Sequence, residues 1–153
     1  MHGGAFSFSA LYSLALALWT GGMAIYTFLV TPAIFRSYGR DKAGEIVGRL
    51  FPGYFLYKLA LSFLALLFFL SAGGGRGPSL SLLVLALLLN AAHRFLLYPA
   101  ILRVKKSVPS FEAAPDSAPR RKFGRLHGAS MLLNLMALAI GIALVILARQ
   151  ALP

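Results

Sequence analysis

The chain contains no cysteine. This absence excludes disulfide bonds, thiolate metal sites, iron–sulfur clusters and a cysteine nucleophile. Negative charge is also scarce, because only 4 acidic residues stand against 15 lysines and arginines. The acids are Asp41, Glu45, Glu112 and Asp116, and all of them lie outside the apolar runs. The sequence therefore shows no carboxylate pair or nucleophile–base pair for catalysis, which favours a protein without enzymatic activity, and no carboxylate inside an apolar run that could relay protons.

Bulk composition places the chain in a membrane. Its 153 residues are 59% hydrophobic and only 12% charged, with a mean hydropathy of +0.78, whereas about a quarter of the residues of an ordinary soluble domain are charged. A transmembrane helix needs about 20 apolar residues, so the length accommodates four spans. The first apolar stretch is too long for a signal peptide and lacks its basic start, so we expect it to be retained as a span.

Apolar runs and turn signals predict one all-α domain over residues 1–153, an integral membrane four-helix bundle. The expected spans cover about residues 8–35, 54–71, 80–99 and 127–147. Apolar residues recur at helical spacing among charged ones over about residues 40–51, which predicts a short amphipathic helix on the membrane surface, ended by Pro52. Residues 104–122 mix proline, serine, alanine and charge without periodicity, and they predict a flexible cytoplasmic connector.

Positive charges are distributed unevenly between the loops. Of the 15 lysines and arginines, four lie in residues 36–53 and seven in residues 100–126. Because basic loops stay in the cytoplasm, we expect both segments there, both termini outside, and a location in the bacterial cytoplasmic membrane. The same asymmetry explains most of the net charge of +11, so anionic lipid head groups are expected partners and nucleic acid is not.

Polar residues inside the expected spans are the candidate functional residues, because a charge in hydrocarbon costs at least about 2.5 kcal/mol. Helical spacing places them on one stripe per helix. The stripes are Tyr54, Lys58 and Ser62 in the second span, Asn90, His93, Arg94 and Tyr98 in the third, and His127, Ser130 and Asn134 in the fourth. All lie in the expected cytoplasmic half, where Trp19, Met23 and Tyr26 of the first span would add a wall. We therefore predict a cationic, histidine-containing pocket there.

Each candidate also has a structural interpretation. Lys58 and Tyr54, near a span end, would snorkel to the interface. Asn90 and Asn134 would be interhelical hydrogen-bonding residues, and Trp19 would be a packing residue. Glycines are open to two readings as well, since Gly21, Gly22, Gly128 and Gly141 allow close helix contacts within the protein or between copies of a homo-oligomer.

Three functions remain open at this stage. The first is a binding or transport protein whose pocket takes a small anionic or amphipathic ligand through Lys58, Arg94, His93 and His127. The second is a haem b-binding protein in which His93 and His127 are the axial ligands. The third is a structural or accessory subunit without a small-molecule site. The first is favoured, although the lack of an intramembrane carboxylate would leave proton transfer to histidine.

Three ordered motifs resemble a known family. They are W-T-G-G-x5-F-x3-P-x2-F from Trp19, A-G-x3-G-x-L-F-P-x-Y-F from Ala43, and F-G-x-L-H-x2-S-x3-N from Phe123. In this order they resemble the transmembrane-protein-205-like family, a domain of unknown function numbered 4149. The resemblance covers nearly the whole chain and implies a fold similar to four-helix copper-resistance proteins and a haem-dependent protoporphyrinogen oxidase. Those relations point toward metals or haem, but the sequence has no methionine-rich or histidine-rich tract for copper.

Overall fold

The protein is helical throughout the part of the chain that the structure describes. The computed structural model describes residues 3–108, 110–111 and 117–151, and the side chains of residues 8–108, 110–111 and 117–148. The elements are α1 (Gly3–Ile25), the π-helical turn η1 (Tyr26–Val30), α2 (Thr31–Ser37), α3 (Arg40–Ser71), α4 (Pro78–Ala92), the π-helical turn η2 (His93–Leu97), α5 (Tyr98–Lys105) and α6 (Ala118–Ala151). No strand occurs in these residues, so the all-α prediction is confirmed.

Four of the helical rods are long and apolar enough to cross a membrane. They are Phe8–Ser37, Arg40–Ser71, Pro78–Lys105 and Ala118–Ala148, and each contains one of the expected spans. All the rods continue beyond the expected spans at one end. Residues 40–53, which include the expected surface helix, continue into the second span, and residues 100–105 and 118–126, which we expected in a loop, are helical. The protein is therefore an integral membrane protein by length and composition of its helices.

The short interfacial helix expected at residues 40–51 is not a separate element. Pro52 lies inside α3 and does not end it. A proline removes only one backbone N–H from a helix, whereas ending the helix there would leave several N–H and C=O groups without partners next to lipid. The expected surface helix is thus the first part of a rod that continues into the membrane.

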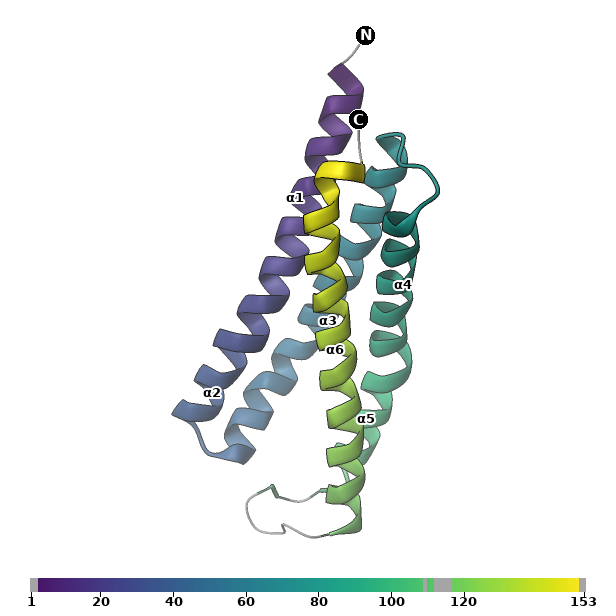
Figure 1. Ribbon diagram of the computed structural model, residues 1–153. Helices are drawn as coiled ribbons and strands as arrows, with labels where there is room; N and C mark the ends of the chain where they lie inside the picture. The colour runs from purple at the N-terminus through teal and green to yellow at the C-terminus, as the bar shows by residue number, and fades with distance from the viewer. Residues whose placement is uncertain (1–2, 109, 112–116, 152–153) are drawn as a thin grey trace.

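The four rods lie side by side, and each contacts two others (Figure 1). α1 packs against α3 and α6, and α4 packs against α3 and α6, so α3 and α6 stand on one diagonal. The fully buried side chains at the centre include Trp19, Phe55 and Leu83. α1 begins and α6 ends at the same end of the molecule (Figure 1); we call the opposite end, which carries the two basic segments, the basic end.

Two rods contain a π-helical turn. η1 and η2 each precede a proline, Pro32 and Pro99 respectively, and the N–H of the residue after each turn bonds five residues back, from Thr31 to Tyr26 and from Tyr98 to His93. A π-turn inserts one residue into an α-helix and often occurs at functional sites. Here both turns begin at a candidate site residue.

Gly141 brings α6 close to α1. A Cβ atom built on Gly141 would lie 2.6 Å from Thr20 Oγ1, whereas one on Gly128 of the same helix would meet nothing within 4 Å. We therefore expect Gly141→Leu to lower the free energy of unfolding in detergent by about 1–3 kcal/mol, as overpacking does, and Gly128→Leu to leave it nearly unchanged. Thermal unfolding followed by the fluorescence of Trp19 measures both; equal stabilities would show that the Gly141 contact is not limiting.

Candidate functional site

A network of polar side chains lies between the four rods. Lys58 of α3 is completely buried, and its Nζ lies 2.9 Å from His93 Nδ1 and 3.3 Å from Asn134 Oδ1. His93 Nε2 lies 2.6 Å from Ser130 Oγ of α6. The network therefore joins α3, η2 and α6 through an unbroken series of hydrogen bonds.

Asn134 connects the network to the remaining rod. Its Oδ1 accepts a hydrogen bond from Tyr54 OH at 2.7 Å, and its Nδ2 donates to Thr27 Oγ1 of η1 at 2.9 Å. Tyr54 in turn stacks on Tyr26, with ring centroids 4.0 Å apart. Since α3 and α6 stand on a diagonal, these side chains bridge two helices whose backbones are not neighbours.

Two adjoining cavities lie next to this network, on the side toward the basic end. The first, which we call the end cavity, has a volume of about 310 Å³ and lies between α2, α3, α5 and α6. The second, the side cavity, has a volume of about 480 Å³ and lies between η1, α2, α3 and α6. The residues that line both are Thr31, Phe35, Phe51, Phe55, His127 and Ser130. Ser130, which bonds to His93, thus connects the polar network to both cavities.

The side cavity reaches the lipid-facing surface of the protein. Its lining includes Phe28 of η1 and Met131 of α6, whose side chains are 58% and 54% exposed. In Figure 1 the basic end of the first rod leans away from α6 in the same region. An apolar group could therefore enter between η1 and α6 from the bilayer.

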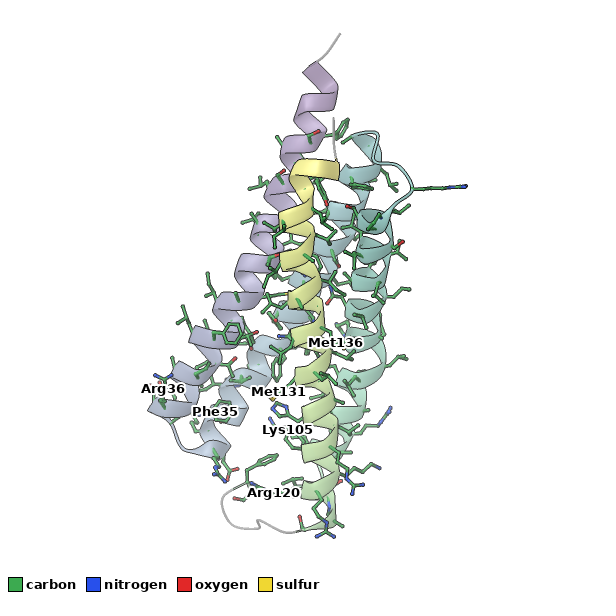
Figure 2. All side chains as sticks on the ribbon, viewed as in Figure 1. Phe35, Arg36, Lys105, Arg120, Met131 and Met136 are labelled. Carbon is green, nitrogen blue, oxygen red and sulfur yellow. The ribbon has the colours of Figure 1, made fainter. Side chains whose placement is uncertain are left out.

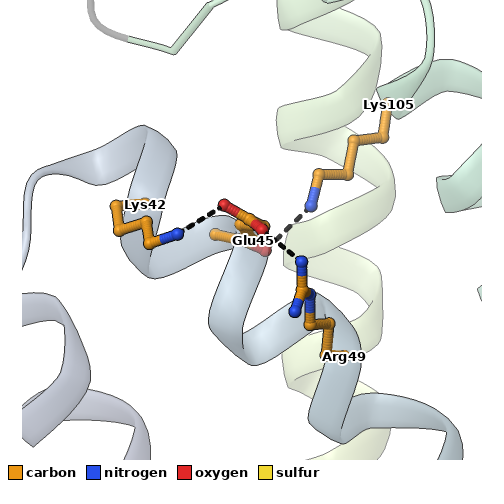
Figure 3. A network of polar contacts seen from close by, with 5 residues as sticks. Lys42, Glu45, Arg49 and Lys105 are labelled. Carbon is orange, nitrogen blue, oxygen red and sulfur yellow. Dashed lines mark hydrogen bonds and ion pairs between the residues drawn. The ribbon is translucent and has the colours of Figure 1, made fainter.

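The end cavity has apolar walls and a basic rim. Arg40, Lys105 and Arg120 line it together with phenylalanines and aliphatic residues. Figure 2 shows Lys105 and Arg120 at the basic end, below Met131. Lys105 reaches from α5 to α3, where its Nζ donates to the carbonyl of Gly44 at 2.8 Å (Figure 3). The acid next to that carbonyl is already paired, since Glu45 binds Lys42 at 3.0 Å and Arg49 at 2.6 Å.

Aromatic residues close the outer wall of the end cavity. Phe111 contacts Phe123 with ring centroids 4.8 Å apart, and Phe123 stacks on His127 at 5.7 Å. Phe111 N–H donates to Asp41 Oδ1 at 2.6 Å, and Arg120 donates to the carbonyl of Phe111. These described residues of the expected connector are therefore tied to α3 and α6; residues 109 and 112–116 of that connector lie outside the described residues.

The structure brings together most of the predicted site residues. Lys58, His93, Asn134, Ser130 and Tyr54 form the network, and His127 lines both cavities. Tyr26 lines the side cavity. Asn90 is more peripheral: its Nδ2 makes one long bond of 3.5 Å to the carbonyl of Lys58, and its Oδ1 has no partner among the described residues.

Two predicted site residues lie apart from the network. Trp19 is fully buried but lines neither cavity, and its Nε1 has no hydrogen-bond partner among the described residues. Arg94 lies over the rings of Phe95 and Tyr98, at 5.7 and 5.9 Å, and lines neither cavity. Arg94 directly follows His93, and the step of about 100° from one residue to the next directs its side chain away from the network.

Other residues of the site could not be recognised from the sequence. Arg40 belongs to the expected surface helix and Lys105 and Arg120 to the expected connector, and Thr27 was passed over as one threonine in an apolar run. The signals were weak: Thr27 and Thr31 are four residues apart and therefore share a helix face, and Phe111 and Phe123 are the aromatic residues beside the basic cluster.

The histidines fit haem poorly. An axial ligand needs a ring nitrogen free to bind iron, but both nitrogens of His93 are hydrogen-bonded within the protein, to Lys58 and Ser130. The side chain is also 1% exposed. In the described residues, no group of three or more histidine, cysteine or acidic side chains could hold a metal ion. We derive no chemistry through a metal or haem.

Comparison with known proteins gives the chain a family. The model of the domain of unknown function DUF4149 matches residues 14–109, a region that contains Tyr54, Lys58 and His93. An uncharacterized protein of Aquifex aeolicus (strain VF5) is 31% identical over 142 residues, which is 90% of this chain and 97% of that protein. No solved structure matches. The family match covers more than half of the chain, and the protein therefore belongs to the DUF4149 family.

Proposed function

We propose that the protein is a membrane-embedded binding or transport protein for a small amphipathic anion. The single observation that carries this proposal is the junction of the two cavities: the end cavity has a basic rim, and the side cavity reaches the lipid-facing surface. An anionic head group would lie near Lys105 and Arg120, and an apolar tail would lie along the phenylalanines toward η1 and α6. Such division into apolar walls and a few polar groups is typical of ligand pockets.

The charge distribution supports an orientation for this site. By the positive-inside rule the basic end would face the cytoplasm of a bacterial cell, where anionic head groups also attract basic residues. The ligand would then enter from the cytoplasm or from the inner leaflet. The polar network lies farther into the membrane than the rim and would contact the ligand through Ser130, His127 and Asn134, which line the side cavity.

Binding of decyl sulfate and decanol to the protein in nanodiscs of zwitterionic lipid tests this function. We expect calorimetry, corrected with empty nanodiscs, to show binding of decyl sulfate and much weaker binding of decanol. Inorganic sulfate should also bind weakly, because it lacks the apolar tail. Lys105→Gln combined with Arg120→Gln should weaken the binding of decyl sulfate at least about tenfold, because each charge-assisted hydrogen bond contributes roughly 1.5 kcal/mol or more.

The matched control removes the same charge from the same end. Lys122 and Arg125 line neither cavity and are exposed. Because salt screens the attraction between such exposed charges and a distant anion, Lys122→Gln combined with Arg125→Gln should leave the affinity for decyl sulfate within about twofold. Equal losses in the two double variants would mean that only net charge matters. Equal affinity for decanol and decyl sulfate would disprove recognition of the anion.

A further inference from the structure

Lys58 is a fully buried amine without a negative partner. Its Nζ contacts His93 Nδ1, Asn134 Oδ1 and the rings of Tyr54 and Phe55, the latter at 5.6 and 5.3 Å. No carboxylate of the described residues contacts it. A buried ammonium without a paired anion is strongly unfavourable.

The titratable and charged groups on the elements packed around Lys58 come from every rod, and none of those that contact it in the described residues is a carboxylate. The first rod contributes Tyr26, α3 contributes Tyr54, η2 contributes His93 and Arg94, α5 contributes Tyr98, and α6 contributes His127. The described residues therefore supply no negative charge to pair with a protonated Lys58, and a bound anion would supply it. The end cavity with its basic rim and the side cavity lined by His93 and Asn134 meet at Ser130, and an anion bound in these joined cavities would lie next to this network.

Ser130 and His93 form a path for a proton between the joined cavities and Lys58. Ser130 lines both cavities and lies 2.6 Å from His93 Nε2, and His93 Nδ1 lies 2.9 Å from Lys58 Nζ. A neutral imidazole has one nitrogen that donates and one that accepts. The hydrogen-bonded series of Ser130, His93 and Lys58 can therefore exist in two states: the neutral His93 has its hydrogen on Nδ1 in one state and on Nε2 in the other.

We propose that the binding of an anion in the two joined cavities is coupled to the uptake of one proton by Lys58 through Ser130 and His93. This inference rests on the proposed function and deepens it, because it makes the ligand an anion that is bound together with a proton. The product is a buried pair of opposite charges, the bound anion and the Lys58 ammonium, with the neutral His93 between them.

The step balances without any electron transfer. A hydronium ion in the cavity gives its proton to the hydroxyl of Ser130, and the O–H bond that Ser130 already had breaks as its proton moves to His93 Nε2. The Nδ1–H bond of His93 then breaks, and that proton forms a new N–H bond with the lone pair of Lys58 Nζ. The hydronium becomes water, Ser130 remains a hydroxyl, His93 becomes the other neutral tautomer, and Lys58 becomes an ammonium.

Calorimetric titration with decyl sulfate, which carries no proton of its own, tests the coupling. At about pH 8 an exposed lysine is already protonated and an ordinary histidine is neutral. We expect the apparent binding enthalpy in nanodiscs to depend on the ionisation enthalpy of the buffer, with a slope that corresponds to about one proton taken up per anion bound. Lys58→Met should remove this slope, and Lys106→Met, which replaces an exposed lysine at the basic end, should retain it.

The outcomes separate the inference from the function on which it rests. Binding of decyl sulfate with no proton uptake by the unmodified protein would overturn the inference alone, whereas the absence of binding would overturn the proposed function as well. Proton uptake that persists in Lys58→Met but is lost in His127→Gln would assign the proton to His127 and overturn the inference. The emission of the buried Trp19 reports whether the variants are folded, and the measurement on the unmodified protein needs no variant.

The rate of uptake tests the path. After rapid mixing with decyl sulfate in a weakly buffered solution, a pH indicator should show uptake at least about tenfold slower for Ser130→Ala than for the unmodified protein. The final amount of proton taken up should be the same, because Lys58 is unchanged. An equally fast uptake would show that the proton does not pass through Ser130.

Discussion

Replacing Asn134 with leucine is expected to lower the free energy of unfolding by about 2–4 kcal/mol, since it leaves buried donors without an acceptor. Asn134 bonds to Tyr54, Lys58 and Thr27, from two different rods. The leucine has a similar volume and can make none of these bonds. Unfolding of the protein in mixed detergent micelles, followed by circular dichroism, measures the loss.

The matched variant is Asn90→Leu, which makes the same change at another buried position. Asn90 donates only one long bond, to a backbone carbonyl that its own helix can also satisfy, and its Oδ1 is unpaired among the described residues. We expect its replacement to leave the free energy of unfolding within about 1 kcal/mol or to raise it, because an unpaired polar atom is removed. If both variants lost the same stability, the interhelical bonds of Asn134 would not be its main contribution.

Gly44→Phe is expected to abolish the binding of decyl sulfate, with a loss of affinity of about 100-fold or more, equal to about 2.7 kcal/mol. Gly44 lines the end cavity, and a Cβ atom there would meet nothing within 4 Å. A Cβ atom built on Gly48, one turn later on the same helix face, would lie 3.1 Å from Lys105 Nζ. A phenylalanine at Gly44 would therefore occupy the cavity beside Lys105.

Gly53→Phe is the control for this variant. Gly53 belongs to the same helix, is exposed, lines neither cavity and has open space at its Cβ position. Both substitutions replace glycine in a helix, which favours the helix by a few tenths of a kcal/mol to about 1 kcal/mol, so neither should destabilise the protein. Titration calorimetry with decyl sulfate should then show a loss for Gly44→Phe alone; unchanged affinity in that variant would place the ligand elsewhere.

The spans and the buried polar residues could be predicted from the sequence because both depend on local pattern. Long apolar runs specify helices in lipid, where every backbone group must be bonded within the chain. Lys58, His93 and Asn134 stood out because polar side chains in such runs are unfavourable unless they are paired. Their mutual contacts follow from depth and helix face, which residue spacing also determines.

The end cavity could not be predicted in the same way. Its rim depends on how far each helix continues beyond the apolar run, and Pro52 gave the wrong answer there because a proline can be accommodated inside a long helix. Lys105 was read as part of a charged loop, although it reaches across from α5 to Gly44 of α3. Arg94 was placed on the polar stripe because it lies four residues after Asn90, but it is about 100° from His93 around the helix and lies over the rings of Phe95 and Tyr98.

Each of the two π-turns contains one residue more than a regular α-helix would have in the same place. An α-helix advances about 100° with each residue, so one additional residue would rotate everything after it; the wide turn of η1 or η2 accommodates that residue and keeps the helix faces before and after it aligned. In a regular α-helix Tyr98 and Ile101, eight and eleven residues after Asn90, would be rotated by about 100° from where they lie here; with η2 they are buried on the same side as Asn90 and His93. Deleting one residue between 94 and 97 would thus turn η2 into regular α-helix and keep Tyr98 and Ile101 on the face of Asn90, whereas inserting a second residue would keep an apolar helix long enough for the membrane yet rotate the wall of the end cavity away from the polar network.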